Sequence, residues 1–220
     1  MVETTKRRGG GMSELRRRQL RLEISREAAR LFWEQGVAAT SGEQIAQGVG
    51  LSVRTIWRHF RSKEACAEPI IMQGVEWFMD TVRSWPRAES LEDHLAAELA
   101  RQSRVMPAAR QADEALGMKM IALADTEPAL RTAWLMACDQ EERELIPIIA
   151  DRMGRPVDDL DVRLHAAAAA AVMRVMDEHI GSALLSGADV SQFRDLKALA
   201  ARVAGTIRIA TGGAVGDPVT

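Results

Sequence analysis

The feature that most constrains this chain is a pair of very short helical segments joined by one tight turn. Residues 40–43, Thr-Ser-Gly-Glu, have the pattern of a capping box, in which the Thr40 hydroxyl accepts from an amide three residues on and Glu43 reaches back. Gly50 suits the left-handed conformation that ends a helix, and Ser52 suits the N-cap of the next helix. The pattern predicts two short helices, braced by a longer helix in front.

The longer helix is expected over residues 12–35, where apolar side chains recur at three- and four-residue spacings until Gly36 stops it. In the second short helix Val53, Ile56 and Phe60 form one buried stripe. The face that points outward carries Arg54, Thr55 and Arg58. Two short capped helices with a tight turn between them make a helix-turn-helix.

Residues 36–64 resemble the DNA-binding signature of the TetR family of bacterial transcriptional regulators. The positions that match the signature are Gly36, Thr40, Ile45, Ala46, Gly50, Ser52, Thr55, Ile56, His59, Phe60, Ser62, Lys63 and Glu64. Trp57 departs from it, because the family usually has Tyr there and an indole lacks the acceptor capacity of a phenol.

The resemblance implies an all-α fold, with an N-terminal helix-turn-helix DNA-binding domain and a C-terminal helical domain for ligand binding and dimerisation. It also implies the function. The chain is expected to be a homodimer that represses transcription from a palindromic operator of double-stranded DNA and is released by a small molecule.

The expected DNA contacts follow from a recognition helix laid in the major groove. Arg54 is the main candidate to read a base, because its guanidinium matches two acceptors of guanine. The chain has no Asn, so adenine would be read by Gln44 or Gln47, which are also ordinary surface residues. The side chains expected at phosphates are Thr40, Ser41, Trp57, His59 and Lys63. The remaining DNA-binding candidates are Ser52, Val53, Thr55 and Arg58, and packing stays open as the role of Trp57 and His59.

Charge is distributed unevenly along a chain whose formal net charge is only −2. Residues 1–66 hold 13 Lys and Arg against 7 Asp and Glu, whereas residues 67–220 hold 16 against 24. The split fits a basic module that meets DNA and an acidic body that does not. The expected parts are a disordered basic arm at 1–11, a DNA-binding domain at 12–62, a ligand-binding and dimerisation domain at 63–211, and a frayed tail at 212–220.

Several classes of protein are excluded by features that the sequence lacks. No apolar run approaches the roughly 18 residues of a membrane helix, and no secretion signal precedes the first helix, so a cytoplasmic location is expected. Cys66 and Cys138 have no metal-binding spacing. Asp177, Glu178 and His179 are neighbours on a helix and point different ways, so they cannot close a metal site. With no catalytic motif in the chain, we expect no enzyme activity, cofactor, metal or membrane partner.

The body is expected to contain five or six helices. The first is predicted from Ser62 to about Ser84 with a bend at Pro69, and the last is predicted to start at a Ser191 cap. Residues 164–176 are apolar on nearly every side and include six consecutive alanines. Such a helix is buried on more than one side. The last two long helices are therefore expected to join two subunits, and the alternative is a core within one chain.

Aromatic and sulfur-containing side chains of the body are candidates to line a pocket for an apolar ligand. These ligand-binding candidates are Trp77, Phe78, Met120, Trp134, Cys138, Met173 and Met176. Taken one at a time, each is better explained by core packing, whereas for the set a pocket is the favoured interpretation, mainly because the resemblance implies one between these helices. The polar groups that could orient a ligand are His94, His165, Arg174, Asp177 and His179, each of which also fits a structural role. Two rivals stay open: a regulator without a small-molecule ligand, and a helical enzyme or carrier whose basic segment is incidental.

Overall fold

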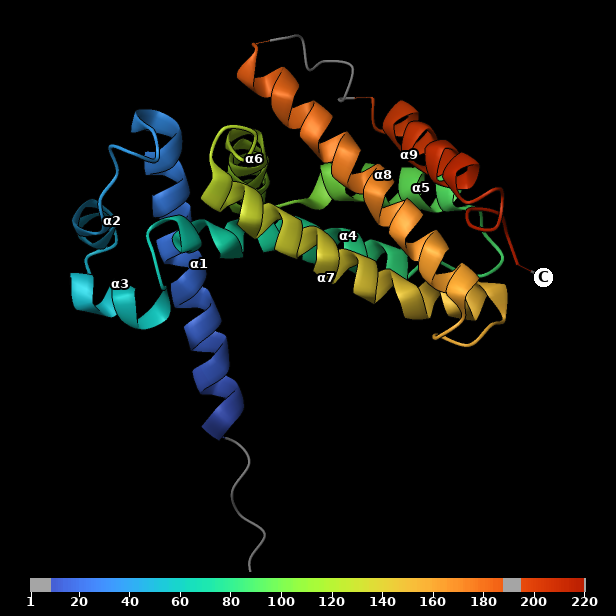
Figure 1. Cartoon of the computed structure of the whole chain (residues 1–220), viewed down its shortest axis with the longest axis horizontal. Helices are drawn as coiled ribbons and strands as arrows, with labels where there is room; N and C mark the ends of the chain where they lie inside the picture. Colours follow the sequence, from blue (N-terminus) through green and yellow to red (C-terminus); the bar gives the residue numbers. More distant parts are fainter. Residues whose placement is uncertain (1–8, 188–194, 220) are drawn as a thin grey trace, which may run out of the picture.

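The computed structural model describes residues 9–187 and 195–219, and this part of the chain is built of helices and turns without a strand. The helices are α1 (Gly9–Gln35), α2 (Gly42–Gly48), α3 (Val53–His59), the 3-10 turn η1 (Glu64–Ala67), α4 (Glu68–Arg83), α5 (Leu91–Val105), α6 (Ala108–Leu123), α7 (Pro128–Met153), α8 (Leu160–Leu185) and α9 (Leu196–Ala210). Figure 1 shows α1, α2 and α3 at one end and the other helices as a larger body, with α4 running through it. The predicted all-α fold is confirmed, and no helix of the described ranges is both long and apolar enough to cross a membrane.

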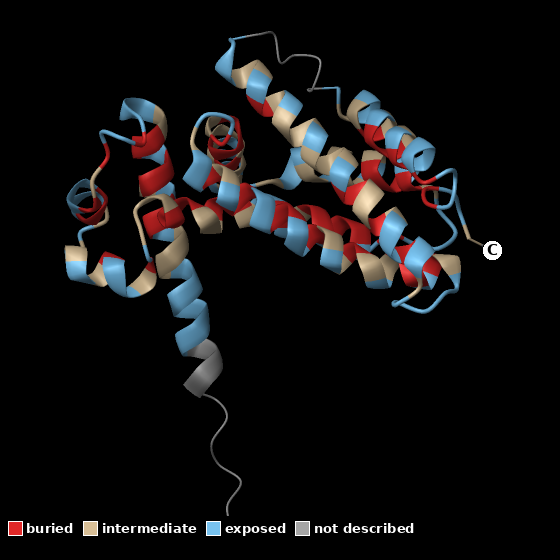
Figure 2. Ribbon diagram, in the orientation of Figure 1, coloured by how far each residue is buried: buried red, intermediate tan, exposed pale blue. Residues whose placement is uncertain are grey.

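Helix α1 connects the two parts of the molecule. It begins at Gly9, three residues earlier than expected, and the rest of the basic arm, residues 1–8, lies outside the described residues. Residues 13–19 are exposed, whereas Ile24, Ala28 and Phe32 are fully buried. Figure 2 shows this change from exposed to buried along α1. The buried half of α1 packs against α2 on one side and against α4 and α6 on the other.

The segment after α3 is not the single bent helix that the sequence predicted. The Ser62 hydroxyl accepts from the Ala65 amide at 3.2 Å and so caps the short turn η1, and α4 begins only at Glu68. Pro69 therefore lies in the first turn of α4, where a missing amide hydrogen has no helical partner to lose. The break between the two parts is at η1, before the proline.

Small residues let α6 approach two other helices closely. A side-chain carbon added at Gly181 of α8 would lie 3.1 Å from the backbone of Ala122 in α6. One added at Gly117 of α6 would lie 3.1 Å from the carbonyl oxygen of Ile70 in α4. Because α6 is pressed against both neighbours, a shift of α6 must also move α4 or α8.

The last helix begins later than expected, and the tail after it is packed. The Asp195 carboxylate caps α9 by accepting from the Ala198 amide at 3.1 Å, whereas the expected cap, Ser191, lies outside the described residues. Beyond α9, Val215 is buried and Leu91 donates its amide to the carbonyl of Gly216 at 2.8 Å. The expectation of a frayed tail is wrong for residues 212–219, because backbone bonds attach them to the start of α5.

A buried arginine reinforces this attachment. Arg152 of α7 stacks its guanidinium 3.2 Å from the centre of the Trp85 ring and donates to the carbonyl of Asp217 at 3.0 Å. It also donates to the carbonyl of Pro86 at 3.2 Å. One side chain thus joins α7, the loop before α5 and the C-terminal tail.

Candidate DNA-binding surface and ligand pocket

The cap of α2 lies one residue later than the sequence pattern suggested. Ser41 Oγ accepts from the Gln44 amide at 3.2 Å, and Gln44 Oε1 accepts from the Ser41 amide at 2.7 Å. The reciprocal pair is therefore Ser41 with Gln44, in place of Thr40 with Glu43. Thr40 turns inward, with only 2% of its surface exposed, and donates its hydroxyl to the carbonyl of Gly36 at 2.9 Å. This placement gives the Thr40 hydroxyl a structural bond and leaves little of it to offer a phosphate.

Lys63, another expected phosphate contact, also points toward the protein. Its Nζ donates to the carbonyl oxygens of Val37 at 2.6 Å and Thr40 at 2.8 Å. These bonds connect the loop before α2 to the segment after α3. The lysine therefore holds the two short helices together as one unit.

Helix α3 is built as the sequence predicts. Ser52 Oγ accepts from the Thr55 amide at 3.2 Å and lies 2.9 Å from the Thr55 hydroxyl. Ile56 is fully buried, and Phe60 nearly so. The opposite, exposed face carries Arg54, Trp57 and Arg58, which together line a shallow surface hollow. Unlike Arg61, which pairs with Glu68 at 2.8 Å, neither Arg54 nor Arg58 has a carboxylate partner in the described part of the chain.

Trp57 has a packing role as well as an exposed face. Its indole lies over the first residue of α2, so that a side-chain carbon at Gly42 would fall only 2.2 Å from Trp57 Cζ2. The indole nevertheless remains 44% exposed. Gly42 is thus needed to set α2 against α3, a requirement that only the packing reveals.

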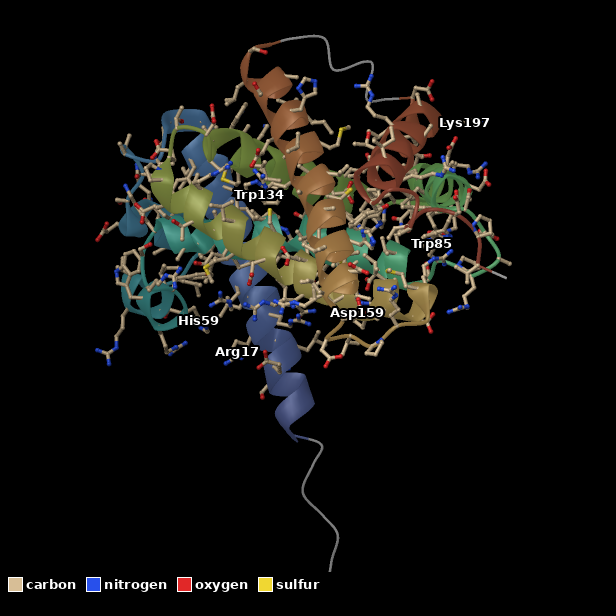
Figure 3. All side chains as sticks on the ribbon, turned by 45° about the vertical axis from the view of Figure 1, so that its right-hand side comes forward. Arg17, His59, Trp85, Trp134, Asp159 and Lys197 are labelled. Carbon is tan, nitrogen blue, oxygen red and sulfur yellow. The ribbon has the colours of Figure 1, made fainter. Side chains whose placement is uncertain are left out.

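His59, labelled in Figure 3, ends α3 and is fixed by α1. Arg21 donates to its backbone carbonyl and places a guanidinium 4.4 Å from the centre of the Phe60 ring. Burial lowers the pKa of His59, and the positive charges of Arg58 and Arg21 lower it further. A neutral imidazole attracts phosphate less than a cation does, so arginines supply most of the positive charge on this surface.

A cavity of about 180 Å³ lies between α4, α6, α7 and α8. Four of the seven expected ligand-binding residues line it: Trp77, Phe78, Trp134 and Met173. The other three lie outside the lining, with Met120 and Cys138 buried in the core and Met176 packed against it. The volume is close to the roughly 150 Å³ of an engineered cavity that binds benzene, so there is room for about one aromatic ring.

The polar part of this lining is acidic, a property that the sequence analysis missed. The carboxyl groups are those of Asp113, Glu114, Glu141 and Asp177, and the described lining contains no Lys, Arg or His. Asp113 is neutralised by Arg26, with contacts of 2.6 and 2.7 Å, and Glu114 lies 3.5 Å from Arg110. Of the polar candidates from the sequence, only Asp177 lines the cavity.

Two of the four carboxyl groups have no counter-charge among the residues that the structure describes. Glu141 is only 2% exposed, and burial, together with the nearby Asp177, raises its pKa to about 8. Burial also raises the pKa of Asp177 to about 7. The neighbouring arginines do not pair with them, because Arg131 and Arg174 both bind Glu178, at 2.6 and 3.1 Å.

Two contacts connect the cavity wall to α1. Ser25 Oγ accepts from the backbone amide of Ile70, a lining residue at the start of α4, at 3.0 Å in a buried setting. Arg26 forms its double hydrogen bond with Asp113, a lining residue on α6. Any displacement of α4 or α6 by cavity contents would therefore act on adjacent residues of α1.

The outer face of α8 and α9 exposes apolar side chains. Leu164 and Val175 of α8 are 56% and 53% exposed, and Ile209 of α9 is 83% exposed. Leu164 and Val175 are eleven residues apart and so share one face of the helix. The prediction that the last two long helices join two subunits stays a prediction, and these side chains are the ones that such an interface would bury.

A capped pair of short helices with an exposed arginine face, joined through α1 to a helical body that holds a cavity, defines a helix-turn-helix regulator of transcription. Residues 24–70 match the family model described as "Bacterial regulatory proteins, tetR family". Over 153 residues the chain is 35% identical to the HTH-type transcriptional regulator TcmR of Streptomyces glaucescens. The alignment covers 69% of this chain and 68% of TcmR. The chain belongs to the tetR family of bacterial regulatory proteins.

Solved structures share the fold at lower sequence identity. Salmonella enterica GusR is 23% identical with a TM-score of 0.54, and the alignment covers 88% of this chain and 94% of GusR. Bacillus subtilis FadR, solved with stearoyl-CoA, is 18% identical with a TM-score of 0.53, covering 87% of this chain and 98% of FadR. Thermus thermophilus FadR, solved with lauroyl-CoA, is 19% identical with a TM-score of 0.52, covering 88% and 94%.

Proposed function

We propose that the chain is a homodimeric repressor that binds a palindromic operator through α3 and leaves it when a small molecule enters the cavity. The observation that carries the proposal is the α3 face, where Arg54 and Arg58 are exposed and have no carboxylate partner in the described chain. Arg54 is the second residue of α3, and the N-terminal end of a recognition helix is the end that contacts base edges. It reads a guanine, and Arg58 and the Ser41 region bind phosphates.

Two copies associate through α8 and α9. The exposed Leu164, Val175 and Ile209 become buried between the subunits, which removes apolar surface from water. A two-fold axis between the copies places two α3 helices on one face of the DNA, about 34 Å or one helical turn apart. This symmetry is the reason to expect a palindromic operator.

Ligand binding acts through the helices that border both the cavity and α1. A ligand that displaces α4 or α6 shifts their bonds with Ser25 and Arg26, tilts α1 and changes the separation of the two α3 helices. Half-sites on DNA have a fixed spacing, so the changed dimer binds less tightly. The two FadR structures, which share the fold and contain acyl-CoA molecules, support a body of this architecture as a holder of small molecules.

The test is operator affinity measured by fluorescence anisotropy over a range of salt concentrations. Phosphate contacts make affinity fall steeply with salt, and Arg58→Ala should reduce that slope by about one unit. Arg61→Ala is the matched control, since Arg61 is exposed but already paired with Glu68. A salt-independent affinity, or equal effects of the two variants, would contradict binding through α3.

A further inference from the structure

We infer that the cavity takes a small organic cation, an amine with an aromatic or alkyl body, whose ammonium group pairs with Glu141 and Asp177. The inference rests on the proposed function, because it names the chemical class of the ligand to which the regulator responds. Its starting point is Glu141, which lines the cavity, is 98% buried and has neither a hydrogen bond nor an ion pair to the described residues. A buried carboxyl without a partner is costly, and a ligand cation supplies that partner.

The positively charged side chains around the cavity already bind other carboxylates. Arg131, Arg174 and the indole of Trp134 all donate to Glu178, which faces α7 and not the cavity. Asp177, the next residue of α8, lines the cavity and receives none of these bonds. Glu141 and Asp177 are therefore the carboxyl groups of the lining that have no positively charged partner among the described residues. They lie on the adjacent helices α7 and α8.

The rest of the lining favours an organic cation over a metal ion. Trp77, Phe78 and Trp134 supply aromatic surface, which attracts ammonium groups as well as apolar ones. The buried Nε1 of Trp77 has no acceptor among the described residues, so it is free to donate to a polar atom of the ligand. The described residues contain no group of three or more His, Cys, Asp or Glu that could hold a metal ion.

The experiment compares three probes of similar size on the full-length protein without DNA: 2-phenylethylamine, neutral 2-phenylethanol and anionic phenylacetate. Binding is measured by titration calorimetry and by the fluorescence of the lining tryptophans. We expect the amine to bind at least about tenfold more tightly than the alcohol, and phenylacetate to bind weakest. Equal binding of amine and alcohol, or a preference for phenylacetate, would overturn the inference.

The variant Glu141→Gln keeps the shape of the side chain and removes its ability to ionise, so it cannot form an ion pair with a bound ammonium group. It should abolish the preference for the amine over the alcohol, whereas Glu142→Gln, the adjacent carboxyl outside the lining, should keep it. Thermal unfolding shows whether the variant is folded, and Asp177→Asn provides a second variant that should lower the same preference. A folded Glu141→Gln protein that still prefers the amine would refute the assignment.

These measurements separate this inference from the function on which it rests. An amine that binds with the expected preference but leaves operator affinity unchanged supports the cavity chemistry and contradicts ligand-controlled repression. Release from DNA by a neutral or anionic compound, without amine binding, contradicts the cavity chemistry and supports the repressor. Loss of Mg²⁺ binding in Glu141→Gln, with no amine binding in either protein, would assign the carboxyl to a metal and also overturn the inference.

Discussion

The double hydrogen bond between Arg26 and Asp113 is the most informative single interaction to perturb, because it joins α1 to the cavity wall. The Asp113 side chain is 5% exposed and that of Arg26 is 44% exposed, and the two contacts are 2.6 and 2.7 Å long. Exposed ion pairs contribute about 0–1 kcal/mol, whereas breaking a buried pair costs about 3–5 kcal/mol. A pair with one buried and one half-exposed partner should show a coupling energy of about 1–2 kcal/mol, between these limits.

The assay is a double-mutant cycle with Arg26→Met, Asp113→Ala and the double variant. The free energy of unfolding is measured in urea at one fixed protein concentration, because a dimer's stability depends on concentration. The matched control is the cycle of Arg18→Met with Glu76→Ala, a 3.2 Å pair that joins α1 to α4 instead of α6 and is exposed on both sides. That control should give a coupling energy below about 0.5 kcal/mol.

The same variants test transmission from the cavity. Without the pair, movement of α6 reaches α1 less effectively, so Asp113→Ala should reduce the effect of a cavity ligand on operator affinity while leaving ligand-free DNA binding within about tenfold of wild type. Equal coupling energies in the two cycles, together with an unchanged ligand response, would refute the role given to Arg26 and Asp113.

Four further outcomes are expected. Arg54→Ala should weaken operator binding by about 1–3 kcal/mol and relax the preference at one base pair. If anisotropy gives Arg54→Ala the same affinities as wild type for a set of operator variants, direct readout of a base by Arg54 is excluded. Val175→Arg should convert the dimer into monomers in sedimentation experiments, and a dimer that survives would place the interface elsewhere. Arg152→Met should lower stability by about 2–4 kcal/mol because it removes the hydrogen bonds to the carbonyls of Pro86 and Asp217 and the stacking of the guanidinium on Trp85, whereas an unchanged melting temperature would show that the tail attachment contributes little. Burial raises the pKa of Glu141 from 4.5 to about 8, so between these pH values the folded chain keeps a proton that the unfolded chain loses. The contribution of the protonated Glu141 carboxyl to the stability of the fold is therefore fully present below about pH 4.5 and is lost as the pH rises toward 8. The stability of Glu141→Gln relative to wild type should therefore increase over that window in urea titrations, and a pH-independent difference would contradict the raised pKa.

Local sequence signals predict the DNA-binding part well, since they are short-range. The Ser52 cap and the stripe of Val53, Ile56 and Phe60 follow from spacing alone, and the structure has both. The same rules fail where two solutions are equally good over adjacent residues. Thr40 with Glu43 and Ser41 with Gln44 both satisfy a capping box, and only the burial of Thr40 decides between them.

The cavity could not be predicted in the same way, because its properties depend on long-range contacts. Sequence identifies Trp77 and Trp134 as candidates, but which face of α7 and α8 borders the cavity depends on packing. The pairing of Asp113 with Arg26, 87 residues away, leaves no local trace. Glu141 reads as one more charged residue in an acidic helix until its burial is known.

Selection of bound sequences from a random pool of double-stranded DNA tests the central claim most directly. A dimer that presents two α3 helices should enrich one sequence with two-fold symmetry, whose half-sites lie about one helical turn apart and each contain a guanine that Arg54→Ala no longer requires. A pool without any enriched sequence, or an enriched sequence without symmetry that Arg54→Ala binds equally well, would contradict the assignment of α3 as the recognition helix of a dimeric regulator.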